Sequence, residues 1–291
     1  MLNRLRQSVL SFFDQGLNPM ANTLDYKGDP GLYGPESVTW KIMRDVSGFM
    51  GGVRALIIQS AHPEVVDGFL QHSTMLKDPI TRLSRTSDYV ATVTFGAMPE
   101  VMGMIKRIQS MHAHVIGTSS RGKQYDANDP YLTAWVHYSL VQSFLLAYQD
   151  YGQDTLTPDE SNQFVLEQTK TARLLGVNIM LETEAELHQW LNFNSNIGQV
   201  ESTLLWINFL KNPPISLATK LGYNCLFNAA IASIHPNLLK CFNEKPKRFA
   251  LLKAQYFVRC LRLAMGESPA MLDAYKRIGR DLPRLSPKYK S

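Results

Sequence analysis

The sequence has little charge and few cysteines, and it has no long uninterrupted hydrophobic run. Charged residues make up only 19% of the 291 residues, against about 25% in an average soluble domain. Hydrophobic residues make up 45%, which is enough to fill a large core. Because a membrane-spanning helix needs a run of about 18 or more apolar residues, we expect no integral membrane segment. These features predict an ordered globular protein.

The three cysteines, Cys225, Cys241 and Cys260, are widely spaced and odd in number. This pattern indicates neither a disulfide framework nor a thiolate metal site, and it is typical of free thiols in a reducing compartment. The apolar stretch at residues 9–13 is interrupted by Asp14 and is too short for an export signal. The predicted location is therefore the cytoplasm.

Several motifs of known chemistry are also missing. The sequence contains no Glu-x-x-His pair of a di-iron site, no His-Glu-x-x-His zinc motif and no Gly-x-Ser-x-Gly nucleophile elbow. Residues 117–123 match the first seven positions of a phosphate-binding loop, but Gln124 stands where the Ser or Thr that holds magnesium is needed. We therefore reject a nucleotide-binding loop.

Positive charge is concentrated toward the end of the chain. From Lys240 onward the sequence has 13 basic and 4 acidic residues, a net charge of +9, whereas the preceding residues have 17 basic and 21 acidic residues, a net charge of −4. Such a region can contact nucleic acid or an anionic membrane. Since the basic residues are scattered, we favour a solvated surface and predict no nucleic-acid partner.

Helical periodicity dominates what is present. Apolar residues follow one helical stripe through residues 38–58, where Gly48, Gly51 and Gly52 predict a kink or a close packing contact. Further helices are expected from near Pro63, from near Thr81, and over 130–151, 157–176, 183–211, 215–233, 246–265 and 268–279. Strand-like alternation is scarce. The prediction is an all-α fold, a single irregular helical bundle-like domain over residues 35–280, with an N-terminal extension over 1–34 and a basic tail over 281–291.

One histidine lies on an apolar helix face. Leu140, Val141, Phe144 and Leu145 lie three, four, seven and eight residues after His137, so its side chain shares their face. An imidazole in this position is either a hydrogen-bonded core residue or a metal ligand in an apolar pocket. Spacing alone favours the core residue.

A second polar stripe occupies the helix expected from Thr81. Arg82, Arg85, Thr86 and Tyr89 fall at positions i, i+3, i+4 and i+7. Guanidinium groups that are partly buried need anionic partners, and no acidic residue lies one turn away on this stripe. The partners are either carboxylates elsewhere in the fold or an anionic ligand or cofactor.

An ordered set of short motifs resembles the catalytic domain of the rubber oxygenase (latex-clearing protein) family, which includes the oxygenase of the mycophenolic acid pathway. The motifs are Ala61-His62-Pro63, Gln71-His72-Ser73, Asp78-Pro79, Arg82-Leu-Ser-Arg85-Thr86, Val93-Thr-Phe95-Gly96, Met111-His112, Gly122 to Pro130, Trp135-Val136-His137 and Tyr148 to Gly152. No single motif is specific, but their order is. The resemblance is close over residues 35–152 and extends by its helical pattern to about 265.

The resemblance implies an all-α domain that holds haem b. It implies that His137 is the axial iron ligand, that Arg82 and Thr86 belong to the Arg-x-x-x-Thr motif, and that Arg85 is the neighbouring basic residue on the distal side. Arg85 and Thr86 are then the candidate catalytic residues. His137, Arg82, Arg85, Thr86 and Tyr89 are the candidate cofactor-binding residues.

The reaction that the resemblance implies is haem-dependent oxidation by dioxygen. The rubber-cleaving members use a carboxylate base about sixteen residues before the Arg-x-x-x-Thr motif, where this sequence has Val66, with Glu64 and Asp67 nearby but not aligned. We therefore predict an oxygenase acting on an apolar intracellular small molecule instead of polyisoprene. The alternatives are a haem-binding or sensing module without turnover and a non-haem helical interaction protein. No heptad run of three or more repeats is present, so no coiled coil is predicted.

Overall fold

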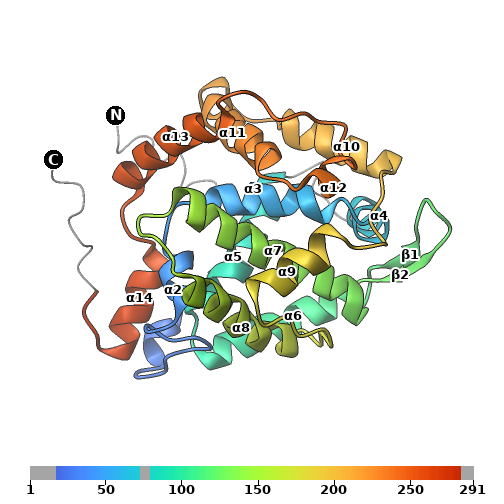
Figure 1. Cartoon of the computed structure of the whole chain (residues 1–291). Coiled ribbons are helices and arrows are strands. Elements are labelled where there is room, and N and C mark those ends of the chain that lie inside the picture. Colours follow the sequence, from blue (N-terminus) through green and yellow to red (C-terminus); the bar gives the residue numbers. More distant parts are fainter. Residues whose placement is uncertain (1–17, 73–78, 283–291) are drawn as a thin grey trace.

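The computed structural model describes residues 18–72 and 79–282, and in this part the chain is built almost entirely of helices (Figure 1). The elements are η1 (Thr23–Asp25), α2 (Val38–Met43), α3 (Gly48–Gln59), α4 (Pro63–His72), α5 (Pro79–Phe95), α6 (Met98–His112), β1 (Ile116–Thr118), β2 (Gln124–Asp126), α7 (Pro130–Tyr151), α8 (Pro158–Leu174), α9 (Glu184–Asn192), α10 (Glu201–Lys211), α11 (Leu217–Ala232), α12 (Pro236–Leu239), α13 (Ala250–Met265) and α14 (Pro269–Ile278). The all-α prediction is confirmed.

The structure differs from the sequence prediction in several places. The stripe over residues 38–58 is divided into α2 and α3, because the chain turns at Asp45, whose carboxylate accepts a hydrogen bond from the backbone N–H of Ser47 at 2.8 Å. The predicted helix over 183–211 is divided into α9 and α10. The antiparallel hairpin of β1 and β2 was not predicted, since three paired residues are too few to show alternation.

α7 is the longest helix of the described chain, and its start follows the predicted signal. The Asp129 carboxylate accepts hydrogen bonds from the backbone N–H groups of Tyr131 and Leu132 at 2.9 and 3.1 Å, and Pro130 occupies the first turn. Most residues of α7 are buried, including Trp135, Tyr138 and Leu145. The helix therefore forms the centre of the main hydrophobic core.

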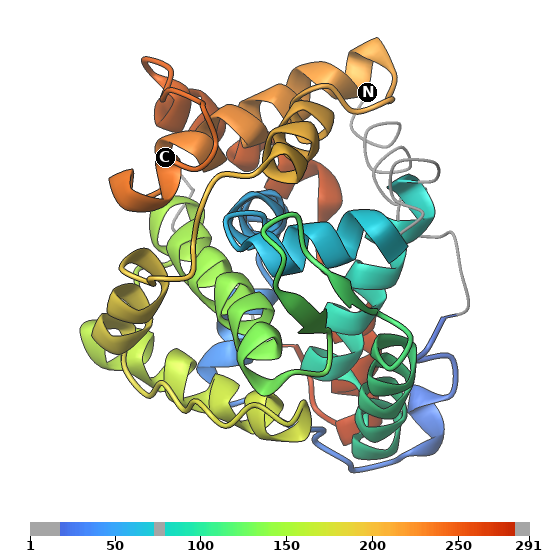
Figure 2. The same ribbon diagram turned by 90° about the vertical axis from the view of Figure 1, so that its right-hand side faces the viewer.

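α3 packs against α7, and Figure 2 shows α3 end-on beside it near the middle of the molecule. The contact is close at Gly51, where an added Cβ would lie 2.7 Å from Cδ1 of Phe144. The close packing contact that was one of the two alternatives predicted for this stripe is present at Gly51, whereas an added Cβ at Gly52 would have no neighbour within 4 Å. The buried guanidinium of Arg54 also joins the two helices, because it donates to Ser143 Oγ at 3.0 Å and to Gln142 Oε1 at 3.2 Å. Burial lowers the pKa of Arg54 to about 9.

Residues 18–34 and α14, which lie far apart in the sequence, pack together. The backbone N–H of Gly28 donates to the carbonyl of Arg277 at 2.8 Å, and Met20 shares a core cluster with Met271 and Tyr275. The domain boundaries at residues 34 and 280 stay predictions. Within the described residues, no helix combines the length and hydrophobicity needed to cross a bilayer.

Candidate functional site

His137 lies in the middle of α7 and is buried, as its spacing among apolar residues predicts. Its Nε2 lies 3.1 Å from the backbone carbonyl oxygen of Gln168 on α8. The tautomer with the proton on Nε2 makes this hydrogen bond and leaves a lone pair on Nδ1. Burial lowers the pKa of His137 to about 4, although the hydrogen bond to Gln168 acts in the opposite direction. The imidazole is therefore neutral near pH 7, which is the form that binds a metal.

A small cavity lies beside His137, between α5, α7 and α8. Its volume is about 40 Å³. The lining is mostly apolar or aromatic and comprises Tyr33, Met43, Tyr89, Val90, Val93, Thr94, His137, Leu140, Val141, Phe144, Phe164, Gln168 and Thr171. A space of this size holds about one water molecule or a diatomic gas.

A chain of buried hydrogen bonds runs along one side of this cavity. The Tyr33 hydroxyl shares a hydrogen bond with Thr171 Oγ1 and lies 3.3 Å from Gln168 Oε1. The Gln168 amide donates to Thr39 Oγ1 at 2.9 Å, and that hydroxyl donates to Glu167 at 2.7 Å. Burial raises the pKa of Tyr33, so its hydroxyl stays protonated. Sequence reasoning missed these residues, because their proximity depends on how residues 33–39 pack against α8.

The structure brings together only some of the residues predicted on α5. Tyr89 lines the cavity with His137, and burial raises the pKa of its hydroxyl. Thr86 is half-buried and lies one turn before Tyr89 on the helix. Arg85 is exposed, in contrast to the partial burial expected for it. The side chain of Arg82 lies outside the described residues.

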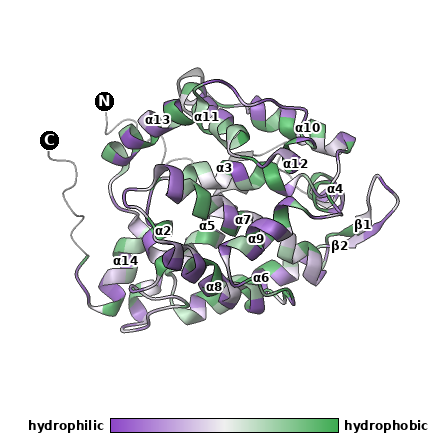
Figure 3. Cartoon of the chain, viewed as in Figure 1, coloured by the Kyte–Doolittle hydropathy of each residue, from purple (hydrophilic) through white to green (hydrophobic). Residues whose placement is uncertain are grey.

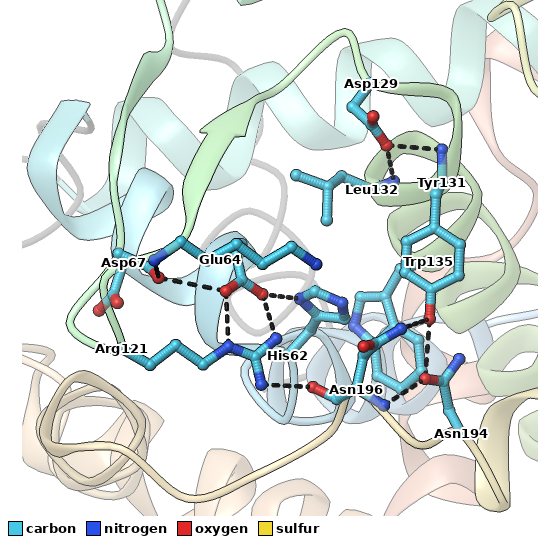
Figure 4. A network of polar contacts seen from close by, with 12 residues as sticks. His62, Glu64, Asp67, Arg121, Asp129, Tyr131, Leu132, Trp135, Asn194 and Asn196 are labelled. Atoms are coloured by element: carbon cyan, nitrogen blue, oxygen red, sulfur yellow. Dashed lines mark hydrogen bonds and ion pairs between the residues drawn. The ribbon is translucent and has the colours of Figure 1, made fainter.

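A second polar cluster lies near the start of α4 (Figure 4). The buried carboxylate of Glu64 accepts hydrogen bonds from both Nε and Nη2 of Arg121, and from Ser119 Oγ at 3.1 Å. Asp67 accepts from the backbone N–H of Ser120 at 2.6 Å. The donors come from the turn between β1 and β2, so the segment that resembled a phosphate-binding loop instead binds two carboxylates of its own chain.

His62 lies within this cluster and is fully buried. Its Nδ1 is 3.2 Å from Glu64 Oε2, but neither ring nitrogen has a hydrogen-bond partner with acceptable geometry among the described residues. Its ring packs against Tyr131 and Trp135 of α7, as Figure 4 shows. Burial is the main cause that lowers the pKa of His62, to about 4, with Glu64 opposing.

The sequence matches a protein-family model over residues 40–263, more than half of the chain. The family is described as ER-bound oxygenase mpaB/B'/Rubber oxygenase, catalytic domain. The chain belongs to this family. The resemblance inferred from the ordered motifs is thereby confirmed. Comparison with curated proteins and with solved structures finds no match.

The rubber oxygenase match includes most of the cavity lining and the polar cluster around Glu64. It covers α3 to α12 and nearly all of α13, and therefore His137, the stripe on α5 and the cluster around Glu64. Tyr33, residues 18–39 and α14 lie outside it. The cavity is therefore lined mainly by the rubber oxygenase domain, with one phenol added by the preceding segment.

The resemblance to rubber oxygenases implies haem b, which can be tested against the residues around His137. The chemistry of the histidine suits an axial ligand, since a metal-binding imidazole commonly donates its second N–H to a backbone carbonyl. The space does not suit the macrocycle, because sites for cofactors and drug-sized ligands measure roughly 300–1,000 Å³ and this cavity measures about 40 Å³. A larger hollow of about 260 Å³ is lined by Lys41 and Glu160 and does not include His137. In the arrangement described, haem does not fit beside His137.

Proposed function

We propose that this chain is an oxygenase that uses dioxygen to oxidise an apolar small molecule, with haem b as its cofactor and His137 as the axial ligand. The observation that carries the reaction class is the family match over residues 40–263. The assignment of His137 rests on the resemblance and on a buried, neutral imidazole with one nitrogen hydrogen-bonded to Gln168. Arg82 and Tyr89 belong to the proposed cofactor site. Arg85 and Thr86 are the proposed catalytic residues.

The small cavity adds a requirement to this proposal. Because about 40 Å³ is available beside His137, haem binding there must displace side chains such as Phe144 and Phe164. Loading with haem should therefore be accompanied by a change in near-ultraviolet circular dichroism, which reports on the packing of aromatic side chains.

A second candidate is a helical interaction protein without haem, in which His137 is a core residue. Two observations favour it: the hydrogen bond from His137 to the Gln168 carbonyl, and side chains that fill most of the space around the ring. In this case the chain keeps the fold of its family without its cofactor.

The absorption spectrum of the purified full-length chain, alone and titrated with haemin, distinguishes the two. The proposal predicts a Soret band that is lost in His137→Ala and retained in His114→Ala, a control at an exposed histidine. Far-ultraviolet circular dichroism checks that both variants are folded. A wild-type chain that takes up no haemin supports the second candidate, and a Soret band retained in His137→Ala shows that another residue is the ligand.

Activity is tested by dioxygen consumption with a set of lipids and isoprenoids. The proposal predicts that Arg85→Ala and Thr86→Val each lower kcat by about tenfold or more, as expected when a hydrogen-bond donor is removed from a reacting oxygen. Ser87→Ala, at a half-buried neighbouring position, should leave kcat unchanged. A haem-loaded chain that consumes no dioxygen with any of these substrates would contradict the oxygenase proposal.

A further inference from the structure

α13 carries apolar residues on two opposite sides. Its inner side, with Ala254, Val258 and Leu261, is buried against α11 and the rest of the core. On its outer side, Leu252, Tyr256, Arg259 and Leu263 fall at positions i, i+4, i+7 and i+11, and we call these four residues the outer stripe of α13. Leu252, Tyr256 and Leu263 are 52%, 69% and 80% exposed. An ordinary surface helix is polar on its outer side. The exposed apolar side chains of the outer stripe therefore indicate a surface that contacts an apolar partner.

Two further exposed apolar side chains lie on α11 and at the start of α13. Leu221 on α11 is 74% exposed, and it adjoins Gly222, against which the ring of Phe257 on α13 packs. Phe249, at the start of α13, is also exposed and has a backbone φ of 63°. A bulky residue seldom adopts this left-handed conformation. Figure 3 shows hydrophobic segments along both helices, which lie together at the upper edge of the molecule in Figure 1.

Between Glu244 and Glu267, the charged residues on and beside α13 have one sign. Residues 245–266 contain six basic residues and no acidic residue. These are Lys245, Lys247, Arg248, Lys253, Arg259 and Arg262. Arg262 is paired with Asp45 at 2.8 Å. The other five are exposed, and within the described residues none lies at ion-pair distance from a carboxylate.

Exposed Leu, Tyr and Phe side chains beside unpaired Lys and Arg match the interface of an anionic bilayer. The apolar groups enter the boundary between headgroups and acyl chains, while the cations lie near lipid phosphates and carboxylates. The phosphate backbone of a nucleic acid would attract the same cations but would leave the leucines without an apolar partner. The combination therefore favours a lipid surface.

We propose that the outer stripe of α13, with Leu221, Phe249 and the flanking Lys253 and Arg248, is a docking surface for an anionic membrane. The chain lies on the bilayer through this surface without spanning it. This inference concerns an edge of the molecule distinct from the cavity beside His137, and it does not depend on haem binding or turnover.

Flotation of the full-length chain with lipid vesicles tests the proposal. We expect binding to vesicles of phosphatidylcholine mixed with phosphatidylserine, weaker binding to phosphatidylcholine alone, and loss of binding at high salt. The double variant Tyr256→Gln/Leu263→Gln removes apolar contacts, and Lys253→Glu/Arg259→Glu reverses charge. Each should weaken binding to the mixed vesicles by about tenfold or more.

Matched control variants change the same residue types elsewhere. Met102→Gln/Met111→Gln replaces exposed apolar residues on α6, and Lys27→Glu/Lys106→Glu reverses exposed charges; both should bind like the wild type. Because all substituted side chains are exposed, melting temperatures should stay the same, which separates docking from folding. The proposal is overturned if the wild type ignores anionic vesicles or if Tyr256→Gln/Leu263→Gln binds undiminished. It is also overturned if sedimentation shows a dimer that this variant dissociates, since a second copy then covers the stripe.

Discussion

The carboxylate of Glu64 is buried, and its charge depends on Arg121. Burial alone would raise the pKa of Glu64, but the hydrogen bonds and the charge of Arg121 lower it overall. We predict that Arg121→Met destabilises the fold by roughly 3 kcal/mol, the lower end of the range for breaking a buried ion pair, since a third of Arg121 is exposed. Urea unfolding measures this change.

The control for this prediction is an ion pair on the surface. Arg280 and Glu36 are both exposed, so Arg280→Met should cost less than about 1 kcal/mol. Equal losses in the two variants would mean that burial of Glu64 does not determine the strength of its ion pair.

His62 should make the fold sensitive to mild acid. Its pKa of about 4 in the folded chain lies below the ordinary value of 6.5, so the unfolded chain binds a proton first as the pH falls. The contribution of His62 to the free energy of unfolding is therefore full above pH 6.5. It is lost progressively as the pH falls to about 4, by about 3 kcal/mol in total. Glu64 and Asp129 raise this pKa, whereas Arg121 and Lys123 lower it further.

The variant His62→Phe keeps an aromatic ring against Tyr131 and Trp135 and removes the titration. Urea unfolding at several pH values between 7.5 and 4 should show a smaller loss of stability in His62→Phe than in the wild type. Because the packing cost of the larger ring is the same at every pH, it does not affect the slope of unfolding free energy against pH, and the slopes of the two proteins can be compared. Parallel curves would refute the assignment of this acid sensitivity to His62.

Single residues show how far the sequence predicts this site. The spacing of His137 among leucines and valines is enough to predict its burial, because it depends only on helix geometry. Its partner Gln168 is 31 residues away, and the contact depends on how α7 and α8 pack. The role of His62 is likewise a matter of tertiary contact, since Arg121 comes from a hairpin too short to be predicted.

The packing of α3 on α7 depends on a missing side chain. At Gly51 an added Cβ would meet Phe144 Cδ1 at 2.7 Å and its Cα at 3.1 Å, and backbone atoms cannot move aside easily. We predict that Gly51→Ala costs about 1–3 kcal/mol despite the better helix propensity of alanine. Thermal or urea unfolding measures the cost.

Gly52, the next residue on the same helix, is the matched control. An added Cβ there has no neighbour within 4 Å, so Gly52→Ala should stabilise the fold by up to about 1 kcal/mol through helix propensity. Opposite signs at adjacent positions are the expected signature of close packing. If both variants stabilise the fold, the α3–α7 contact is looser than the structure indicates.

At the level of whole helices, the periodicity of apolar residues predicts that a helix is present better than it predicts where that helix begins and ends. The start of α7 is correct because Asp129 and Pro130 form a local signal that needs no tertiary contact. The break between α2 and α3 escapes prediction because it depends on Asp45, which receives hydrogen bonds from Ser47 and from Arg262 of α13. A residue 217 positions away cannot be read from a local pattern.

In the molecule as a whole, the packed elements extend beyond the residues that match the family model. The match ends at residue 263, yet α14 and residues 18–34 pack on each other and on Trp40 and Phe95. The two ends of the described chain thus form one cover over the rubber oxygenase domain. Tyr33, which lines the cavity, belongs to this cover. The geometry beside His137 therefore depends on residues outside the family match.

Arg277 on α14 holds this cover together. Its buried guanidinium donates to the carbonyl of Asp29 at 2.8 Å and to Thr23 Oγ1, and it lies 4.0 Å from Glu100. We predict that Arg277→Met leaves these acceptors buried without donors, so that residues 18–34 open locally. Hydrogen–deuterium exchange should become faster at the amide of Gly28, which donates to the Arg277 carbonyl, while the amides of α7 stay protected.

Lys276→Met, at the adjacent exposed position, should exchange like the wild type. Faster exchange spread evenly over α7 and the cover would show instead that the ends and the family domain unfold as one unit.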